Sequence, residues 1–189
     1  MKTTIPKKRI LSLPLLALAL TAAGCSSLAE STTPSSKHYL QGLRYETGQG
    51  VEVDHAEAAR CYRLAAERGH PAAQNNLGLL HYTGRGVPLS REKAARWYGL
   101  AAGQGFAPAQ ANLGLLHLLG HGVDRNVEKG ISLLTRAARR HEVKACFTLG
   151  LAYAKGLGVQ ENPEEAARWF LQAAHQGDAK AQFLVGLVY

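Results

Sequence analysis

Apolar side chains recur along most of the chain at the spacing of amphipathic helices. Within residues 71–83, one stripe is formed by Ala73, Leu77, Leu80 and His81. Leu77 lies four positions after Ala73, and Leu80 and His81 lie three and four positions after Leu77, so an α-helix places all four side chains on one face. The pattern therefore predicts a helix over 71–83 whose stripe faces the core.

The same pattern returns every 36 residues, and glycine marks the period most clearly. Three glycine columns keep this spacing: Gly42, Gly78, Gly114, Gly150 and Gly186; Gly48, Gly84, Gly120 and Gly156; and Gly50, Gly86, Gly122 and Gly158. Alanine pairs follow it at 65–66, 101–102, 137–138 and 173–174. A fixed period of roughly 20 to 50 residues is typical of solenoids. We expect an all-α fold, an α/α solenoid of about four and a half 36-residue helix-turn-helix repeats over 37–189.

Each repeat carries the start signal of a second helix. The signal is a residue whose side-chain oxygen can cap free backbone N–H groups, and it falls at Asp54, Ser90, Asn126 and Asn162. The preceding G-x-G-V segment supplies the backbone freedom for the turn between the two helices. The glycine inside each first helix lowers helix stability, and its recurrence indicates that a neighbouring helix approaches closely there.

The stretch AAQNNLGLLHYTGRGVPLSREKAARWYGLAAGQG, over 72–105, resembles a Sel1-like repeat, a relative of the tetratricopeptide repeat. Trp97-Tyr98 and Trp169-Phe170 occupy the paired aromatic positions, whereas Leu133-Leu134 replaces that pair in the third unit. The resemblance implies a solenoid that binds a protein or peptide, with the first helix of each repeat lining the concave surface.

The first 24 residues have the organisation of a secretory signal. Basic residues precede an apolar run over 10–20, which is too short to span a membrane, and small residues follow at 21–24. Ala22-Ala23-Gly24-Cys25 resembles the lipobox of bacterial lipoproteins, which implies cleavage before Cys25 and a lipid on its thiol. The alternative is an ordinary secretory signal beside an incidental cysteine. Residues 25–36 are then the lipidated cysteine and a flexible Ser/Thr-rich tether. Ser26 after the cysteine implies a cell-envelope protein held by its lipid at the outer membrane and facing the periplasm.

Charge changes this picture little. The chain has 22 basic and 14 acidic residues and a formal charge of +8. Four of the basic residues, Lys2, Lys7, Lys8 and Arg9, belong to the leader, so the remainder carries only +4. Such a small excess argues against nucleic-acid binding. One basic cluster remains, from Arg136 to Lys144, and it is either a solvated helix end or a site for an acidic partner.

Three motifs have a chemical and a structural interpretation. Ser90 and Lys93 match the S-x-x-K of serine enzymes, but no companion motif follows and Ser90 is already a predicted cap. His117 and His121 have the spacing of metal ligands, yet they lie at a helix end without a further ligand. Cys61 and Cys146 lie in distant units, so we expect buried thiols and no disulfide. The sequence thus predicts no catalytic residue, no metal and no cofactor.

The side of each first helix opposite the core stripe is the expected partner groove. Its predicted exposed residues are Asn75, Tyr82, Leu118, Phe147 and Phe183. The sequence predicts a membrane-anchored scaffold for protein–protein interaction. An enzyme or enzyme accessory acting on the cell wall or its precursors is the alternative, and a structural spacer is a third possibility.

Overall fold

A computed structural model describes residues 33–186 of the chain. Within this range the secondary structure consists of α2 (Pro34–Thr47), α3 (His55–Ala66), α4 (Pro71–Thr83), α5 (Arg91–Gly103), α6 (Ala107–Leu119), α7 (Val127–Ala138), α8 (Val143–Lys155), α9 (Pro163–His175) and α10 (Ala179–Gly186). No strand occurs in the described range. None of these helices is long and apolar enough to cross a membrane.

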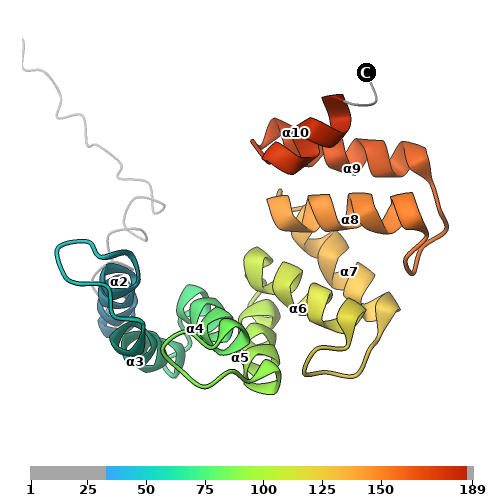
Figure 1. The fold of residues 1–189 in the computed structure, drawn as a ribbon. Helices are drawn as coiled ribbons and strands as arrows, with labels where there is room; N and C mark the ends of the chain where they lie inside the picture. The colour runs from blue at the N-terminus through green and yellow to red at the C-terminus, as the bar shows by residue number, and fades with distance from the viewer. Residues whose placement is uncertain (1–32, 187–189) are drawn as a thin grey trace, which may run out of the picture.

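The helices form consecutive antiparallel pairs, α2/α3, α4/α5, α6/α7 and α8/α9, and α10 is the first half of a further unit. Each pair packs on the next, so that the described helices follow an open arc from α2 to α10 (Figure 1). In this view α4 and α6 lie toward the inner side of the arc and α5 toward its outer side. The predicted α/α solenoid is confirmed.

The predicted caps begin the second helix of each unit. Asp54 Oδ1 accepts hydrogen bonds from the backbone N–H groups of Ala56 at 2.8 Å and Glu57 at 3.0 Å. Ser90, Asn126 and Asn162 cap α5, α7 and α9 in the same way. These bonds satisfy donors that a helix leaves free in its first turn.

The glycine turn after α4 has two separate requirements. Gly84 has a φ of 72° and ends the helix in the left-handed conformation, with its N–H donating to the Leu80 carbonyl. At Gly86 the reason is contact between units, because a Cβ there would lie 2.2 Å from the backbone of His55 in the previous unit. The turn of one unit thus rests on the start of the second helix of the unit before it.

The core is built from small residues that let the helices approach closely. The stripe predicted in α4 is buried: Ala73, Leu77 and Leu80 are fully covered and His81 is 4% exposed. Gly78 lies under the ring of Tyr98, and a Cβ there would be 2.8 Å from Tyr98 Cε1. Gly42 and Gly150 lie in the same way against Tyr62 and Phe170. The predicted close approach at this glycine column is therefore confirmed.

A column of glutamines, which the sequence pattern did not single out, joins each unit to the previous one. The Nε2 atoms of Gln74, Gln110 and Gln182 donate to the carbonyls of Ala66, Ala102 and Ala174 at 3.0 to 3.3 Å. These carbonyls lie at or near the ends of α3, α5 and α9, and each also accepts at 2.9 Å from the N–H of the glycine three residues on. The 36-residue spacing of the glutamines is a signal that could have revealed this role.

The predicted tether is three residues too long. Helix α2 begins at Pro34, and Thr33 caps it by accepting from the N–H of Ser36 at 3.2 Å. Residues 34–36 are therefore helical and not part of a tether. The composition misled the prediction because Ser, Thr and Pro are common both in linkers and at helix starts.

Candidate functional site

The five residues predicted to line a partner groove do not share one exposed surface. Asn75 is only 8% exposed, so the expectation that its column faces solvent is wrong there. Its amide lies between α4 and α6, where Asn75 Oδ1 accepts from Asn112 Nδ2 at 2.9 Å. The next unit therefore covers this side chain, which a pattern within one helix cannot show.

Leu118 and Phe147 are half-buried for a similar reason. Leu118 packs over Gly130 of its own unit, where a Cβ would lie 2.8 Å from Leu118 Cδ2. The Phe147 ring packs at 5.6 Å from that of Phe170 and contributes to the core around α7, α8 and α9. Phe183, by contrast, is 66% exposed. Tyr82 is half-buried and lines a hollow on the inner side of the arc.

This hollow has a volume of about 70 Å³ and draws on three successive units. We use the name inner face for the surface formed by Leu79 and Tyr82 of α4, Asn112 and Leu115 of α6, and Lys144 of α8. All three leucine and tyrosine side chains in this set are half-buried, and Lys144 is exposed. The inner face thus combines apolar surface with one positive charge.

A chain of hydrogen bonds orients the polar groups of the inner face. Lys144 Nζ donates to Asn112 Oδ1 at 2.9 Å, and the amide of Asn112 donates in turn to Asn75. Asn75 Nδ2 then donates to Asn76 Oδ1 at 3.3 Å. Each amide is held in one orientation because its oxygen accepts from one side and its nitrogen donates to the other. These hydrogen bonds use one proton of the Lys144 ammonium and leave the others free for an acceptor on a bound partner.

Tyr82 is held in place by the following unit. Its hydroxyl lies 3.2 Å from Nδ1 of His121, which is in the turn after α6, and the two ring centroids are 6.3 Å apart. The contact fixes the edge of the hollow across a junction between units. Asn76 and Asn112 share a column of the 36-residue period, so their recurrence was a signal of this surface that the sequence analysis did not use.

The residues with a possible chemical role have structural partners. Ser90 Oγ accepts from the N–H of Lys93 and donates to the Glu92 carboxylate at 3.0 Å. His117 Nδ1 donates to the Asp124 carbonyl at 3.2 Å, so it and His121 face different partners. Within residues 33–186 no three His, Cys, Asp or Glu side chains gather as metal ligands would.

The cysteines and the basic cluster also have places in the fold. Cys61 and Cys146 are buried free thiols, and burial raises the pKa of both. Cys146 stands in the glutamine column, with its sulfur 3.9 Å from the Ala138 carbonyl. In the basic cluster, Arg140 Nη1 donates to the Gly105 carbonyl and Lys144 Nζ donates to Asn112, so these two side chains are bonded to the preceding units. Cys25 lies outside the described residues.

The repeat units coincide with those of a known family. The Sel1 repeat profile matches residues 38–70, 71–106, 107–141 and 143–178, which together cover most of the chain. The chain belongs to the Sel1 repeat family. Sel1 repeats form solenoids that generally serve as scaffolds for protein–protein interaction. A search of curated proteins found no match to this chain.

Two solved Sel1 repeat structures resemble the chain. One is c5321, a protective antigen present in uropathogenic Escherichia coli strains with an SLR fold; it is 35% identical with a TM-score of 0.74 over 83% of this chain. This chain spans 34% of the length of c5321. The other is a Sel1 repeat protein from Oxalobacter formigenes, 32% identical with a TM-score of 0.68, covering 85% of this chain and 68% of that one.

Proposed function

We propose that this Sel1 repeat chain is a lipid-anchored scaffold at the cell envelope that binds a protein partner on its inner face. Cys25 carries the lipid, and the repeats stand off the outer membrane on the periplasmic side. The proposal assigns the chain no catalytic step and no cofactor.

The observation that carries the proposal is the composition of the inner face. Three successive units contribute to one surface in which apolar side chains adjoin an oriented chain of amides that ends at a lysine ammonium. Such a surface suits a partner segment with apolar side chains beside a carbonyl or carboxylate acceptor.

The absence of a catalytic role in the proposal rests on the partners of the reactive side chains. In an S-x-x-K enzyme the lysine activates the serine, whereas the Ser90 hydroxyl caps α5, bonded to the Lys93 N–H and the Glu92 carboxylate, and no hydrogen bond joins it to the Lys93 ammonium. His117 is 7% exposed and bonded to a backbone carbonyl. Neither residue therefore offers a free acid or base to a substrate.

The anchor rests on the sequence before the repeats. A basic segment, a short apolar run and small residues lead to Cys25, and a lipid on that thiol would tie the N-terminal side of α2 to the bilayer. Only seven residues separate Cys25 from Thr33, the cap of α2. The first repeat is then held close to the membrane surface.

The test compares cells that express the wild type with cells that express Cys25→Ser, both grown with labelled palmitate and treated with an amine-reactive crosslinker. We expect the wild type to take up label, to remain with the membrane and to co-purify crosslinked to a protein. Cys25→Ser should lose the label and the membrane retention. A wild type without label, or with a mature N-terminus other than Cys25, would contradict the anchor; a wild type that crosslinks to no protein would contradict the scaffold.

A further inference from the structure

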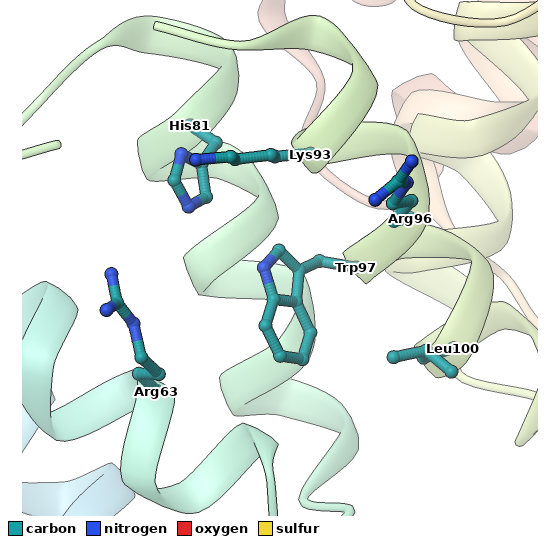
Figure 2. A pocket seen from close by; sticks show the side chains of 6 residues that line it. All are labelled: Arg63, His81, Lys93, Arg96, Trp97 and Leu100. Carbon is teal, nitrogen blue, oxygen red and sulfur yellow. The ribbon is translucent and has the colours of Figure 1, made fainter. Parts of the chain in front are cut away.

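A second, larger cavity lies away from the inner face, between the second helices of the first two units. It has a volume of about 400 Å³ and is lined by Arg63, His81, Lys93, Arg96, Trp97 and Leu100. Figure 2 shows the Trp97 indole at the centre of these side chains, with Arg63 from α3 on one side and Leu100 of α5 on the other. We call this cavity the Trp97 groove.

Three cations of the Trp97 groove have no partner within the described part of the chain. The side chains of Arg63, Lys93 and Arg96 make no hydrogen bond and no ion pair there, and all three residues are exposed. Glu92 lies one turn before Arg96 on α5, but its carboxylate accepts from the Ser90 hydroxyl instead. Glu92 interacts with Arg96 through space, but within residues 33–186 no carboxylate forms an ion pair with Arg63, Lys93 or Arg96, so positive charge gathers around the Trp97 ring.

The first and fourth repeats have an ion pair that this arrangement lacks. In the first unit Glu57 pairs with Arg60 at 2.9 Å, and in the fourth unit Glu165 pairs with Arg168 at 2.7 Å. Arg96 is the equivalent arginine of the second unit, and the position of its acidic partner is occupied by Lys93. The change removes an ion pair and adds a third cation to the groove.

The fourth unit provides an internal comparison at the same place. Trp169 occupies the position of Trp97, and it contributes to the core around α7, α8 and α9. Gln172 stands in place of Leu100, and its amide donates to the Ala138 carbonyl and lies 3.2 Å from His141 Nδ1. Arg168 and Gln172 beside Trp169 thus have partners within the protein, although Trp169 Nε1 is buried without one, whereas the side chains of Lys93 and Arg96 beside Trp97 have none within residues 33–186.

His81 adds a neutral group to the floor of the groove. It is 4% exposed, and its Nδ1 donates to the Pro88 carbonyl at 3.3 Å. Burial lowers the pKa of His81, and the nearby charges of Lys93 and Arg63 lower it further. The imidazole is therefore uncharged at neutral pH and contributes no positive charge to the groove. It lies in the electric field of the same cations, Lys93 and Arg63, that an anionic ligand would contact.

From this geometry we infer that the Trp97 groove binds an acidic peptide segment that has an apolar side chain between its carboxylates. The guanidinium groups of Arg63 and Arg96 and the ammonium of Lys93 bind the carboxylates, and the faces of Trp97 and Leu100 cover the apolar side chain. Arginine suits carboxylates because its planar fork of donors matches them. This site does not depend on the inner face, since the two surfaces share no residue.

The test uses the peptide Glu-Glu-Leu-Glu-Glu, with blocked ends, and the full chain carrying Trp169→Phe. Because the chain has two tryptophans, Trp97 is then the only indole whose fluorescence responds. We expect a saturable change with this peptide and binding at least about tenfold weaker with Gln-Gln-Leu-Gln-Gln, since one lost charge contact of ordinary strength gives about that factor.

Lys93→Glu is the decisive variant and Lys129→Glu is its matched control. Lys129 occupies the same repeat position in the third unit, so both variants change the net charge equally. Glu at position 93 can pair with Arg96 and places a negative charge in the first turn of α5, so the melting temperature should not fall. We expect Lys93→Glu to weaken peptide binding by about tenfold or more and Lys129→Glu to leave it unchanged.

Three results would overturn the inference. Equal losses in Lys93→Glu and Lys129→Glu would mean that only the overall charge attracts the peptide. No saturable change in the Trp97 fluorescence with the acidic peptide would mean that the groove does not bind it. Binding of the wild type to phosphatidylglycerol vesicles that Lys93→Glu abolishes, without saturable peptide binding, would assign the groove to a lipid surface instead.

Discussion

At the scale of single residues, glycine determines how closely the helices of one unit approach. Gly78 is buried in α4, and the Tyr98 ring, which is 2% exposed, occupies the space where its Cβ would be. Gly99 in α5 also lies inside a helix, yet a Cβ there would meet no atom within 4 Å. Both glycines therefore lie inside helices, but only Gly78 is packed against another side chain.

The contrast predicts opposite effects of the same substitution. Gly99→Ala should stabilise the fold by up to about 1 kcal/mol, which is the gain in helix propensity. Gly78→Ala makes the same gain, but the new methyl group pushes the buried Tyr98 ring and the α5 backbone away from α4. Overpacking of this kind costs about 1–3 kcal/mol. Thermal unfolding of the two variants should show a higher melting temperature for Gly99→Ala and a lower one for Gly78→Ala. A rise in both would show that the glycine column has no packing role.

Residue-scale prediction from sequence succeeded where one helix decides the environment and failed where two units meet. The stripe of Ala73, Leu77 and Leu80 is buried as predicted, because helical spacing alone places it. Asn75 is also buried, but the next unit covers it. Its Oδ1 accepts a hydrogen bond from Asn112, which lies 37 residues further along the chain. The period could not have shown this contact, since α6 has Ala111 where α4 has Asn75.

At the scale of elements, the starts and ends of helices were predictable because local chemistry fixes them. The four predicted caps at the helix starts all form. After the second helix of each unit the chain turns at a glycine, except after α7. His141 stands where the other units have Gly69, Gly105 and Gly177, and it adopts the same left-handed conformation with a φ of 60°. The fold of the other units therefore imposes a conformation that histidine alone would avoid.

Helix α10 covers the end of the fourth unit. Its Ala181 is fully buried, and Gln182 donates to the Ala174 carbonyl at 3.1 Å. Leu184 and Val185 line an apolar cavity of about 240 Å³ together with side chains of α8 and α9. Without α10, the apolar side of α9 meets water, and solenoid ends need such covers.

Deleting residues 178–189 should therefore lower the melting temperature and promote self-association. The loss of three buried or half-buried apolar side chains corresponds to about 2–4 kcal/mol. Phe183→Ala is the matched control, because that side chain is 66% exposed and its removal should leave unfolding unchanged. Calorimetry combined with size-exclusion chromatography measures both properties. A monomeric deletion variant with the melting curve of the wild type would show that α10 is not a cap.

At the scale of the whole molecule, repetition predicts the solenoid, and departures from repetition mark its candidate sites. The period of 36 residues placed every helix pair without reference to tertiary contacts. Lys93 replaces the glutamate of the first and fourth units and recurs as Lys129 in the third, and Asn75 corresponds to Ala111 in the third unit; the two surfaces lie at these positions. A comparison of the units with one another could have found Lys93, but not that α3 brings Arg63 to the same groove.

The central claim is that partners bind on the inner face, and site-specific photo-crosslinking in cells tests it most directly. A photoreactive residue in place of Leu79 or Leu115 lies on the inner face, and one in place of Leu89, which is 61% exposed in the turn before α5, is the control. Melting curves of the purified variants establish that each is folded. The account predicts a protein adduct from positions 79 and 115 and none from position 89. Adducts from position 89 alone, or no adduct from any of the three positions, would contradict it.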